Sequence, residues 1–358
     1  MNLVRLKVAA YDRLPPAVFG GLSRLYRIAL SLAARSLAFS RSHLALSLRV
    51  AQRRVGEADR QLLARPAHAA LANWNAAFDD YEQVRSPRTV RLAWTHKPMG
   101  GNYGDWLSPY IVRHVTGARI VHADLGEARR YPHLVALGSI ITYANRHSTV
   151  LGAGVNAVSD HIDPGADFRM VRGHVTRDLL PRHARSSEMV CCDPGFFLGH
   201  LYRPKEPKVP GRRLLIPHIN HHGHFAAVDH EGFELVDARR CRAADVEALI
   251  DAIAGATDVV TSAMHIFVTC CVYGVRCALI KPAHGATGVS GDGIKYRDCM
   301  SPVLGEDFRP TMVDMRAGVR LSECVETRRY GLDVDHIARS LDAFRALLDA
   351  DAGKRARA

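Results

Sequence analysis

The stretch that decides the fold is Asp258-Val-Val-Thr-Ser-Ala-Met-His-Ile-Phe-Val-Thr-Cys-Cys-Val-Tyr-Gly-Val-Arg-Cys-Ala-Leu-Ile280. Residues 259–261 are apolar and β-branched, so they predict a short strand. Ser262 can cap a following helix through its hydroxyl, and Gly274 can end that helix in the left-handed conformation. Residues 275–280 resume a β-like pattern. The stretch therefore predicts a strand–helix–strand crossover, the unit of parallel α/β sheets.

His265 lies in the first turn of the predicted helix. A helix N-terminus presents free N–H groups and a partial positive charge, which favour a bound anion and a neutral imidazole. A histidine that loses its proton readily beside a phosphate site is suited to proton transfer. A histidine packed inside a helix is the alternative interpretation of this stretch taken alone.

The composition is that of a globular protein large enough for two domains or one large domain: 358 residues, 47% hydrophobic and 23% charged. The net charge of +12 indicates anionic partners, such as phosphates, acidic glycans, a membrane surface or nucleic acid. Aromatic residues make up only 7%, and no helix-turn-helix, RNP or zinc-finger pattern occurs. We therefore expect no nucleic-acid partner.

Cysteine usage and the absence of targeting patterns predict a cytoplasmic location. None of the eight cysteines forms a C-x-x-C pair, and most stand in apolar runs, as buried thiols in a reducing compartment do. The start of the chain shows no secretory signal, and no uncharged apolar run reaches the roughly 18 residues needed to span a bilayer.

Residues 1–87 differ from the rest of the chain and predict a basic, amphipathic helical extension. Residues 21–50 predict one long helix with arginines on one face and apolar side chains on another. Such a helix can lie on an anionic membrane, so residues 20–50 are candidates for peripheral membrane contact. Packing on the domain or on a second subunit is the alternative. A further helix is predicted over 57–81, interrupted at Pro66.

From residue 88 onward, strands, loops and helices alternate. The Pro-rich segment 204–211 predicts a linker between two α/β halves, 88–203 and 212–330. A C-terminal helix with a basic tail is expected over 331–358. In the first half, strands are predicted at 90–95, 133–137, 149–151, 168–171 and 189–192. In the second half, strands are predicted at 214–216 and 233–236, with a helix over 244–254.

Small or charged residues follow these strands, at the sheet edge where open α/β proteins gather ligand groups. The glycine-rich loop 97–105 would let the backbone approach a ligand before a helix over 106–116. Asp105 is the N-cap of that helix or a general base. Arg172, next to a glycine at a strand end, suits a bidentate grip on phosphate or carboxylate. A surface arginine is the alternative.

The run His218-Ile-Asn-His-His-Gly-His224 could bind a metal, with the carboxylate of Asp229 as a hydrogen-bond partner of a ligating histidine. Its spacing matches no standard zinc pattern, and adjacent histidines on a strand or loop point apart. We therefore predict no metal site.

Eight motifs in order over residues 90–300 resemble those of the polysaccharide pyruvyl transferase family. They are Gly101-Asn-Tyr-Gly-Asp105-Trp-Leu, Ala136-Leu-Gly-Ser-Ile-Ile, Leu151-Gly-Ala-Gly, Val171-Arg-Gly-His-Val-Thr-Arg177, Asp193-Pro-Gly-Phe-Phe, Ile216-Pro-His218, Val260-Thr-Ser-Ala-Met-His265 with Tyr273-Gly274, and Ile294-Lys-Tyr-Arg-Asp298. The resemblance does not extend to the first 85 residues. The family usually has Gly after the histidine, where this chain has Ile266.

The resemblance implies two Rossmann-like halves that face a cleft, as in type-B glycosyltransferases, and phosphoenolpyruvate as co-substrate without a further cofactor. It implies transfer of pyruvate as a ketal to a sugar diol during exopolysaccharide or cell-surface glycan synthesis. The acceptor would be a lipid-linked oligosaccharide at the inner face of the cytoplasmic membrane, where anionic groups attract a basic extension.

Ketal formation from an enol phosphate requires an acid, a base and cations that hold carboxylate and phosphate. We assign His265 as general acid, Asp105 as base or acceptor-positioning group, and Arg172 and Lys295 as anion-binding groups. The other residues expected to bind substrate are Asn102, Gly104, Gly138, Ser139, Gly154, Ser262 and His218.

Two other functions remain open on the sequence. One is a type-B glycosyltransferase with a nucleotide-sugar donor. The other is a non-catalytic relative that acts as a binding component of glycan assembly, which the altered residues Ala263, Met264 and Ile266 would suit.

Overall fold

The computed structural model describes residues 76–96, 101–123, 128, 130–225, 230–282, 293–305, 307–313, 321 and 325–357. The chain divides into two compact units, 1–79 and 80–358. The helix predicted over 21–50, with its membrane contact, lies outside the described residues, as do Asp229 and the start of the loop 97–105. Residues 76–82, at the end of the second predicted helix, are helical.

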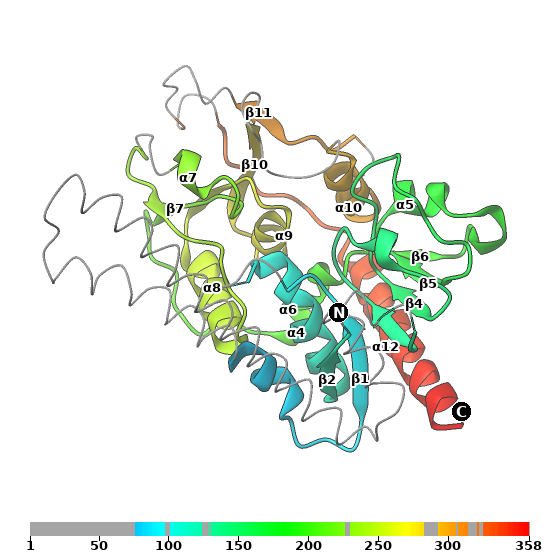
Figure 1. Ribbon diagram of the computed structural model, residues 1–358. Helices are drawn as coiled ribbons and strands as arrows, with labels where there is room; N and C mark the ends of the chain where they lie inside the picture. Colours follow the sequence, from blue (N-terminus) through cyan, green and yellow to red (C-terminus); the bar gives the residue numbers. More distant parts are fainter. Residues whose placement is uncertain are drawn as a thin grey trace, which may run out of the picture. The chain divides into compact units, whose positions relative to one another are not determined.

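The described strands of the second unit form two parallel sheets, which confirms the α/β prediction (Figure 1). The first sheet has the order β2-β1-β3-β4-β5-β6, and the second has the order β11-β10-β9-β7-β8. The strands are β1 (Thr89–Ala93), β2 (Arg119–His122), β3 (His133–Val135), β4 (Ser148–Leu151), β5 (Asp167–Val171), β6 (Val190–Cys191), β7 (Arg213–Ile216), β8 (Glu234–Leu235), β9 (Asp258–Thr261), β10 (Arg276–Pro282) and β11 (Thr311–Val313).

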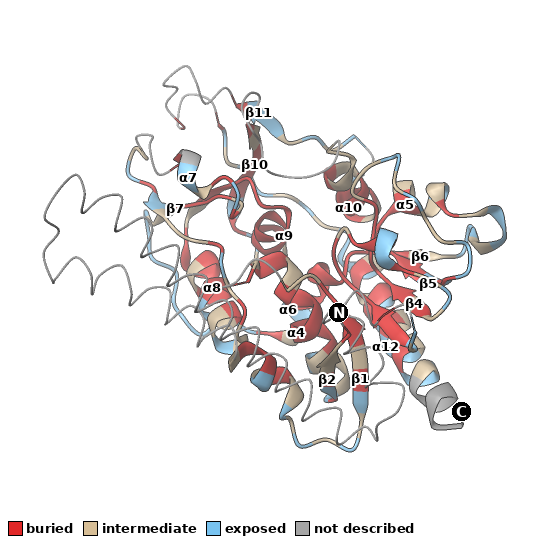
Figure 2. Ribbon diagram, viewed as in Figure 1, coloured by how far each residue is buried: buried red, intermediate tan, exposed pale blue. Residues whose placement is uncertain are grey.

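Helices cover these sheets. They are α4 (Tyr103–Thr116), α5 (His174–Leu179), α6 (Leu198–Leu201), α7 (His222–Phe225), α8 (Ala243–Gly255), α9 (Met264–Val272), α10 (Ile294–Leu304) and α12 (Val334–Arg357), with short 3₁₀ turns η1 (Ile141–Tyr143), η2 (Arg182–Ala184) and η3 (Pro194–Phe197). α9 is mostly apolar, and residues 264–271 are all buried (Figure 2). A helix of this kind belongs in a protein interior.

The helix ends correct two predictions and confirm one. Ser262 does not cap α9, because the helix begins after Ala263. Asp105 is not the N-cap of α4, which begins after Asn102 and places Asp105 in its first turn. Neither N-cap residue makes a side-chain capping bond, so the usual sequence signal for a helix start is missing. Gly274 does follow α9, with a φ of 63°.

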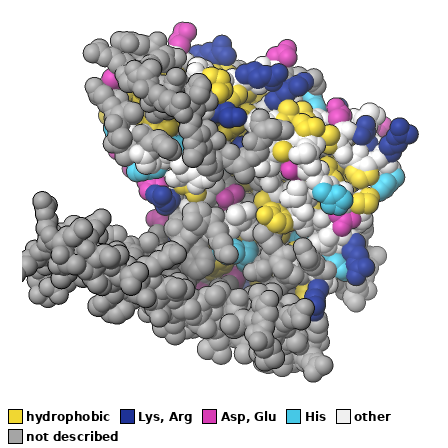
Figure 3. Space-filling view, turned by 45° about the horizontal axis from the view of Figure 1, so that its top comes forward, with side chains coloured by type: hydrophobic (Ala, Val, Ile, Leu, Met, Phe, Trp, Pro, Cys, Tyr) yellow, Lys and Arg dark blue, Asp and Glu magenta, His cyan; other side chains and the backbone are white. Residues whose placement is uncertain are grey.

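The face shown in Figure 3 carries Lys and Arg side chains in several separate groups, with hydrophobic and polar side chains between them. The described helices include none that combines the length and the apolar composition needed to cross a bilayer.

Two elements from the end of the chain pack on the first sheet's half of the fold. α10 lies beside α5, and α12 runs along β6 and η3 (Figure 1). The rings of Phe344 and Phe197 lie 5.4 Å apart, and Nε2 of His336 lies 2.8 Å from the carbonyl oxygen of Cys191. Segments distant in sequence are thereby joined to the edge of the first sheet.

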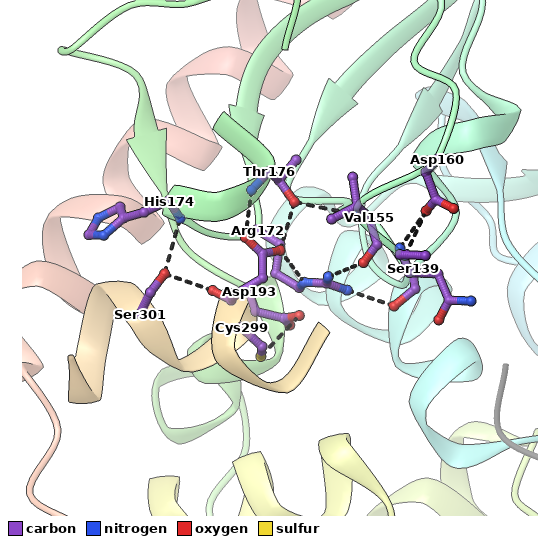
Figure 4. Close-up of polar contacts among 12 residues, drawn as sticks. Ser139, Val155, Asp160, Arg172, His174, Thr176, Asp193, Cys299 and Ser301 are labelled. Carbon is purple, nitrogen blue, oxygen red and sulfur yellow. Dashed lines mark hydrogen bonds and ion pairs between the residues drawn. The ribbon is translucent and has the colours of Figure 1, made fainter. Parts of the chain in front are cut away.

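A buried ion pair fastens α10 to the first half. Arg172 is fully buried, and its Nε donates to Oδ2 of Asp298 over 2.8 Å. The same guanidinium donates from Nη1 to Ser139 Oγ over 2.7 Å and from Nη2 to the carbonyl oxygen of Val155 (Figure 4). Asp298 also accepts from the backbone N–H and the hydroxyl of Thr176, both over 2.7 Å. The charges of the pair are thus compensated by hydrogen bonds, as burial requires.

Replacing Asp298 with alanine should lower the free energy of unfolding by about 3–5 kcal/mol, because the buried Arg172 then loses its counter-ion. Urea denaturation followed by circular dichroism measures the change. The control is Asp342→Ala, which removes an ion pair in which Asp342 is 75% exposed, and its effect should stay below about 1 kcal/mol. Equal losses in the two variants would contradict the fastening role.

Candidate functional site

A cleft of about 400 Å³ lies between the two halves of the second unit. Eight of the eleven predicted site residues line it: Asn102, Gly104, Asp105, Gly138, Ser139, His218, His265 and Lys295. Its volume falls in the range of small-molecule sites. The structure therefore brings together most of the residues that the sequence placed at strand ends.

The strand order explains the position of the cleft. In each sheet the strand that comes first in the chain lies between the second and the third. The connection after β1 therefore runs to one side of its sheet and the connection after β3 to the other, and the same holds for β7 and β9. Ligands bind in the crevice beyond the carboxyl ends of such strand pairs. Thr95 and Ser139 follow β1 and β3, whereas His218 and His265 follow β7 and β9. The crevices beyond the two sheets therefore open into the same cleft.

His265 is held from two sides in the first turn of α9. On one side, its Nε2 lies 3.5 Å from Oδ2 of the fully buried Asp193. On the other, the Cα of Gly104 packs so closely against the ring that a Cβ there would overlap Nδ1. Tyr103 supports this approach, since its hydroxyl lies 2.7 Å from Oγ1 of Thr269, which donates to the carbonyl oxygen of His265. Only 9% of His265 is exposed.

Asp193 favours one tautomer of His265 and leaves the other ring nitrogen on the side of the cleft. Burial alone would raise the pKa of Asp193, but the nearby His265 and Arg172, with the N–H of Gly195, hold it below its ordinary value. A carboxylate at 3.5 Å favours a proton on Nε2. Nδ1 then faces Gly104, which lines the cleft. A buried carboxylate beside an imidazole is an arrangement suited to proton transfer.

Asp105 is a half-buried carboxyl whose ionised form is disfavoured. Burial raises its pKa from 3.8 to about 6, although the hydrogen bond from Asn102 and the nearby His265 and Lys295 oppose this shift. Nδ2 of Asn102 donates to Oδ2 of Asp105 over 2.9 Å. A carboxyl with a pKa near neutrality can both take up and release a proton, as a general base must.

Lys295 brings a cation into the cleft from the first turn of α10. Burial, together with the neighbouring Arg172 and Lys281, lowers its pKa to about 8, and Asp105 partly offsets this. The amine is therefore still mostly protonated near neutral pH. A desolvated ammonium group of this kind is suited to bind a phosphate or a carboxylate.

His218 is a neutral hydrogen-bonding group. Burial, and the charges of Lys295, His221 and His265, lower its pKa to about 3. Its Nδ1 accepts the N–H of Asn220 over 3.2 Å, so the ring proton resides on Nε2. His218 can thus donate to a substrate oxygen without carrying charge.

Three predicted site residues do not line the cleft. Arg172 has its guanidinium engaged by Asp298, Ser139 and Val155, so it acts on the cleft by positioning Ser139. A Cβ at Gly154 would overlap that guanidinium, which explains the glycine. Ser262 is buried, and its Oγ accepts the N–H of His218 over 3.0 Å. It supports the His218 loop.

Sequence patterns did not predict the roles of Asp193 and Asp298, although the two residues stand in the motifs Asp193-Pro-Gly-Phe-Phe and Ile294-Lys-Tyr-Arg-Asp298. Each is fully buried and lies beside a basic side chain more than 70 residues away in the chain, His265 for Asp193 and Arg172 for Asp298. A buried position requires a carboxylate to have a partner. An aspartate directly after a buried strand and before Pro-Gly, as at Asp193, is the signal that could have pointed to this role.

Other predictions concern metals and thiols. Within the ranges that the structure covers, no three His, Cys, Asp or Glu side chains form a group that could hold a metal ion. The seven described cysteines are buried thiols, as predicted. Cys324 lies outside the described residues.

Comparison with protein-family models, with curated proteins and with solved structures finds no match for this chain.

Asp105→Asn should reveal a pH-dependent cost of ionising Asp105. The folded chain holds the Asp105 proton with a pKa of about 6, above the ordinary value of 3.8. The contribution of the Asp105 proton to the free energy of unfolding is therefore fully present below pH 3.8 and is lost as the pH rises through about 6. The variant should match wild type near about pH 3.5 and unfold at a higher temperature near about pH 8. A gap that is constant with pH would contradict the raised pKa.

Gly104→Ala should displace the His265 ring, because the added methyl would overlap Nδ1. We expect shifted imidazole resonances of His265 in ¹H–¹⁵N spectra and a free energy of unfolding lower by about 1–3 kcal/mol. The control is Gly223→Ala, where an added Cβ meets no described atom within 4 Å. Unchanged His265 resonances in Gly104→Ala would refute the close approach of the two residues.

Proposed function

We propose that the protein is a polysaccharide pyruvyl transferase, which moves the pyruvyl group of phosphoenolpyruvate to a sugar diol as a ketal. The observation that supports this most is the meeting of His265, Asp105 and Lys295 in one cleft between two parallel-sheet halves. The sequence motifs that resemble this family supply the same residues. On this proposal the two halves form a type-B glycosyltransferase-like enzyme.

The reaction needs the groups that line the cleft. A proton is added to the methylene carbon of the enol phosphate, and a sugar hydroxyl forms a bond to C2 after losing its proton. The C2–O bond to phosphate then breaks, and a second hydroxyl attacks C2 and releases its proton as the ketal closes. One of the two hydroxyl protons replaces the one given to the methylene carbon, and the other leaves with phosphate or base.

Each residue has a role that its surroundings favour. His265 takes up a second proton on Nδ1, while Asp193 balances the charge of the imidazolium, and then delivers that proton to the methylene carbon. Asp105, whose pKa is about 6, takes a hydroxyl proton. Lys295 holds the phosphate or the carboxylate, and the neutral His218 donates a hydrogen bond to the same substrate. Arg172 is a positioning residue for Ser139.

The acceptor in this proposal is a lipid-linked oligosaccharide at the cytoplasmic face of the membrane, and no further cofactor takes part. Peripheral membrane contact through residues 20–50 would bring the cleft to such an acceptor. Those residues lie outside the described part of the chain.

Isothermal titration with phosphoenolpyruvate tests the donor assignment. Lys295→Ala should weaken binding about 10- to 100-fold, since one charge-assisted contact contributes about 1.5–3 kcal/mol. His265→Ala should retain binding but abolish phosphate release when an acceptor glycan is present, because the acid is removed.

Lys205→Ala is the matched control, because Lys205 is 68% exposed and pairs with Glu247 away from the cleft. Its affinity for phosphoenolpyruvate should equal that of wild type. Binding of uridine diphosphate in place of phosphoenolpyruvate would instead favour a glycosyltransferase. Binding of phosphoenolpyruvate without turnover on any glycan would favour a non-catalytic relative.

A further inference from the structure

An aromatic side chain lines the cleft and remains exposed to solvent. Tyr143 belongs to the 3₁₀ turn η1, which follows β3, and 46% of it is exposed. Ile141 in the same turn is fully buried and anchors it in the core. Because its neighbour Ile141 is buried, the turn holds the Tyr143 ring in place at the cleft. A ring held in this way can serve as a contact surface for a ligand.

A carboxylate from the next loop lines the same cleft. Oδ2 of Asp160 accepts the backbone N–H of Asn156 over 2.6 Å and that of Ala157 over 3.1 Å. Both bonds use Oδ2, and Figure 4 draws dashed lines at the Asp160 carboxylate. Asp160 and Asn156 both border the cleft. The loop that follows β4 thus adds hydrogen-bonding groups beside the ring.

The two loops are joined to each other. The N–H of Gly154 donates to the carbonyl oxygen of Gly138 over 3.0 Å, and the N–H of Ile141 donates to that of Gly154 over 3.4 Å. The buried Arg172 donates a hydrogen bond to Oγ of Ser139 over 2.7 Å. The ring and the carboxylate are therefore held on one rigid support, which lowers the entropic cost of binding a ligand.

The titratable groups of the cleft come from different elements. Lys295, His265 and the Asp105 carboxyl near them reach it from α10, α9 and α4, whereas Asp160 reaches it from the loop after β4. A carboxylate repels an anionic donor but binds hydroxyl groups through charge-assisted hydrogen bonds. An aromatic face in addition suits the apolar C–H face of a pyranose ring. A neutral, hydroxyl-rich ligand is what this part of the cleft would recognise.

We infer that Tyr143, Asn156 and Asp160 form a sugar subsite, in which the Tyr143 ring stacks on a pyranose and Asp160 accepts hydrogen bonds from its hydroxyls. The inference rests on the proposed function, because it locates the acceptor glycan relative to Asp105 and His265. It gives the two substrates separate parts of one cleft, the anionic donor beside Lys295 and the acceptor beside Tyr143 and Asp160.

Saturation-transfer NMR with three simple glycosides tests the subsite on the full chain. The probes are methyl β-D-galactopyranoside, methyl β-D-glucopyranoside and methyl α-D-mannopyranoside, each with and without phosphoenolpyruvate. At least one should bind wild type, and its affinity should fall about tenfold in Tyr143→Ala and in Asp160→Asn. Val158→Ala is the matched control, because Val158 is 52% exposed in the same loop as Asp160 but does not border the cleft. It should bind as wild type does.

Three results would overturn the subsite. They are no binding of any glycoside to wild type, equal affinity in Tyr143→Ala and Val158→Ala, and binding of uridine diphosphate that depends on Tyr143, which would assign this part of the cleft to a nucleotide. The donor assignment is judged separately, by phosphoenolpyruvate binding to wild type and Lys295→Ala. Tyr143-dependent glycoside binding without phosphoenolpyruvate binding would support the sugar subsite and refute the pyruvyl donor.

Discussion

The ion pair between Arg172 and Asp298 is the interaction on which the arrangement of the cleft depends. It joins the end of β5 to α10, a helix that follows the second sheet's strand β10 in sequence but packs on the first half. Lys295 stands one turn before Asp298 on that helix, so the pair also determines where the Lys295 amine lies. The same guanidinium holds Ser139. One buried cation thus aligns groups from both halves without itself lining the cleft.

Burial gives the residues of the cleft their different chemical roles. It raises the pKa of Asp105 and lowers the pKa values of Lys295 and His218, as expected when solvent is removed from acids and bases. Asp193 differs, because its charged neighbours outweigh burial and keep it ionised. The cleft therefore combines a carboxyl that can gain a proton, a neutral imidazole and an imidazole paired with a fixed negative charge. This separation of properties is typical of sites for proton transfer.

The sequence predicted the parallel sheets well, because strands buried on both faces read as short continuous apolar runs between turn residues. It missed β2 and β11, which each lie at the edge of a sheet. β2 carries Arg119 and His122 at its ends, and β11 is only three residues long. It also placed the start of α4 three residues late, since Asn102 caps that helix without a side-chain bond. Local patterns cannot supply such boundaries when the usual capping contact is absent.

Most of the candidate site could be predicted because it lies at strand ends, and parallel strands end at the same edge. The roles of Arg172 and Ser262 could not, because both depend on burial. Their partners, Asp298 and the His218 backbone, are 126 and 44 residues away in the chain. The partnership of His265 with Asp193 likewise exists only in the folded chain. A strand-end pattern indicates where polar groups gather, but only packing decides which of them face the ligand.

The position of α12 has a consequence for how the chain matures during synthesis. This last described helix packs on β6 and η3, the elements that bracket Asp193, through contacts such as Phe344 with Phe197. A ribosome makes the strands of both described sheets before α12, so the packing behind Asp193 is completed only after residues 334–357 have been synthesised. A nascent chain halted before residue 334 contains every described strand yet lacks this packing. Assembly of the edge of the first sheet is in this way tied to the synthesis of a segment that lies more than 130 residues further along the chain.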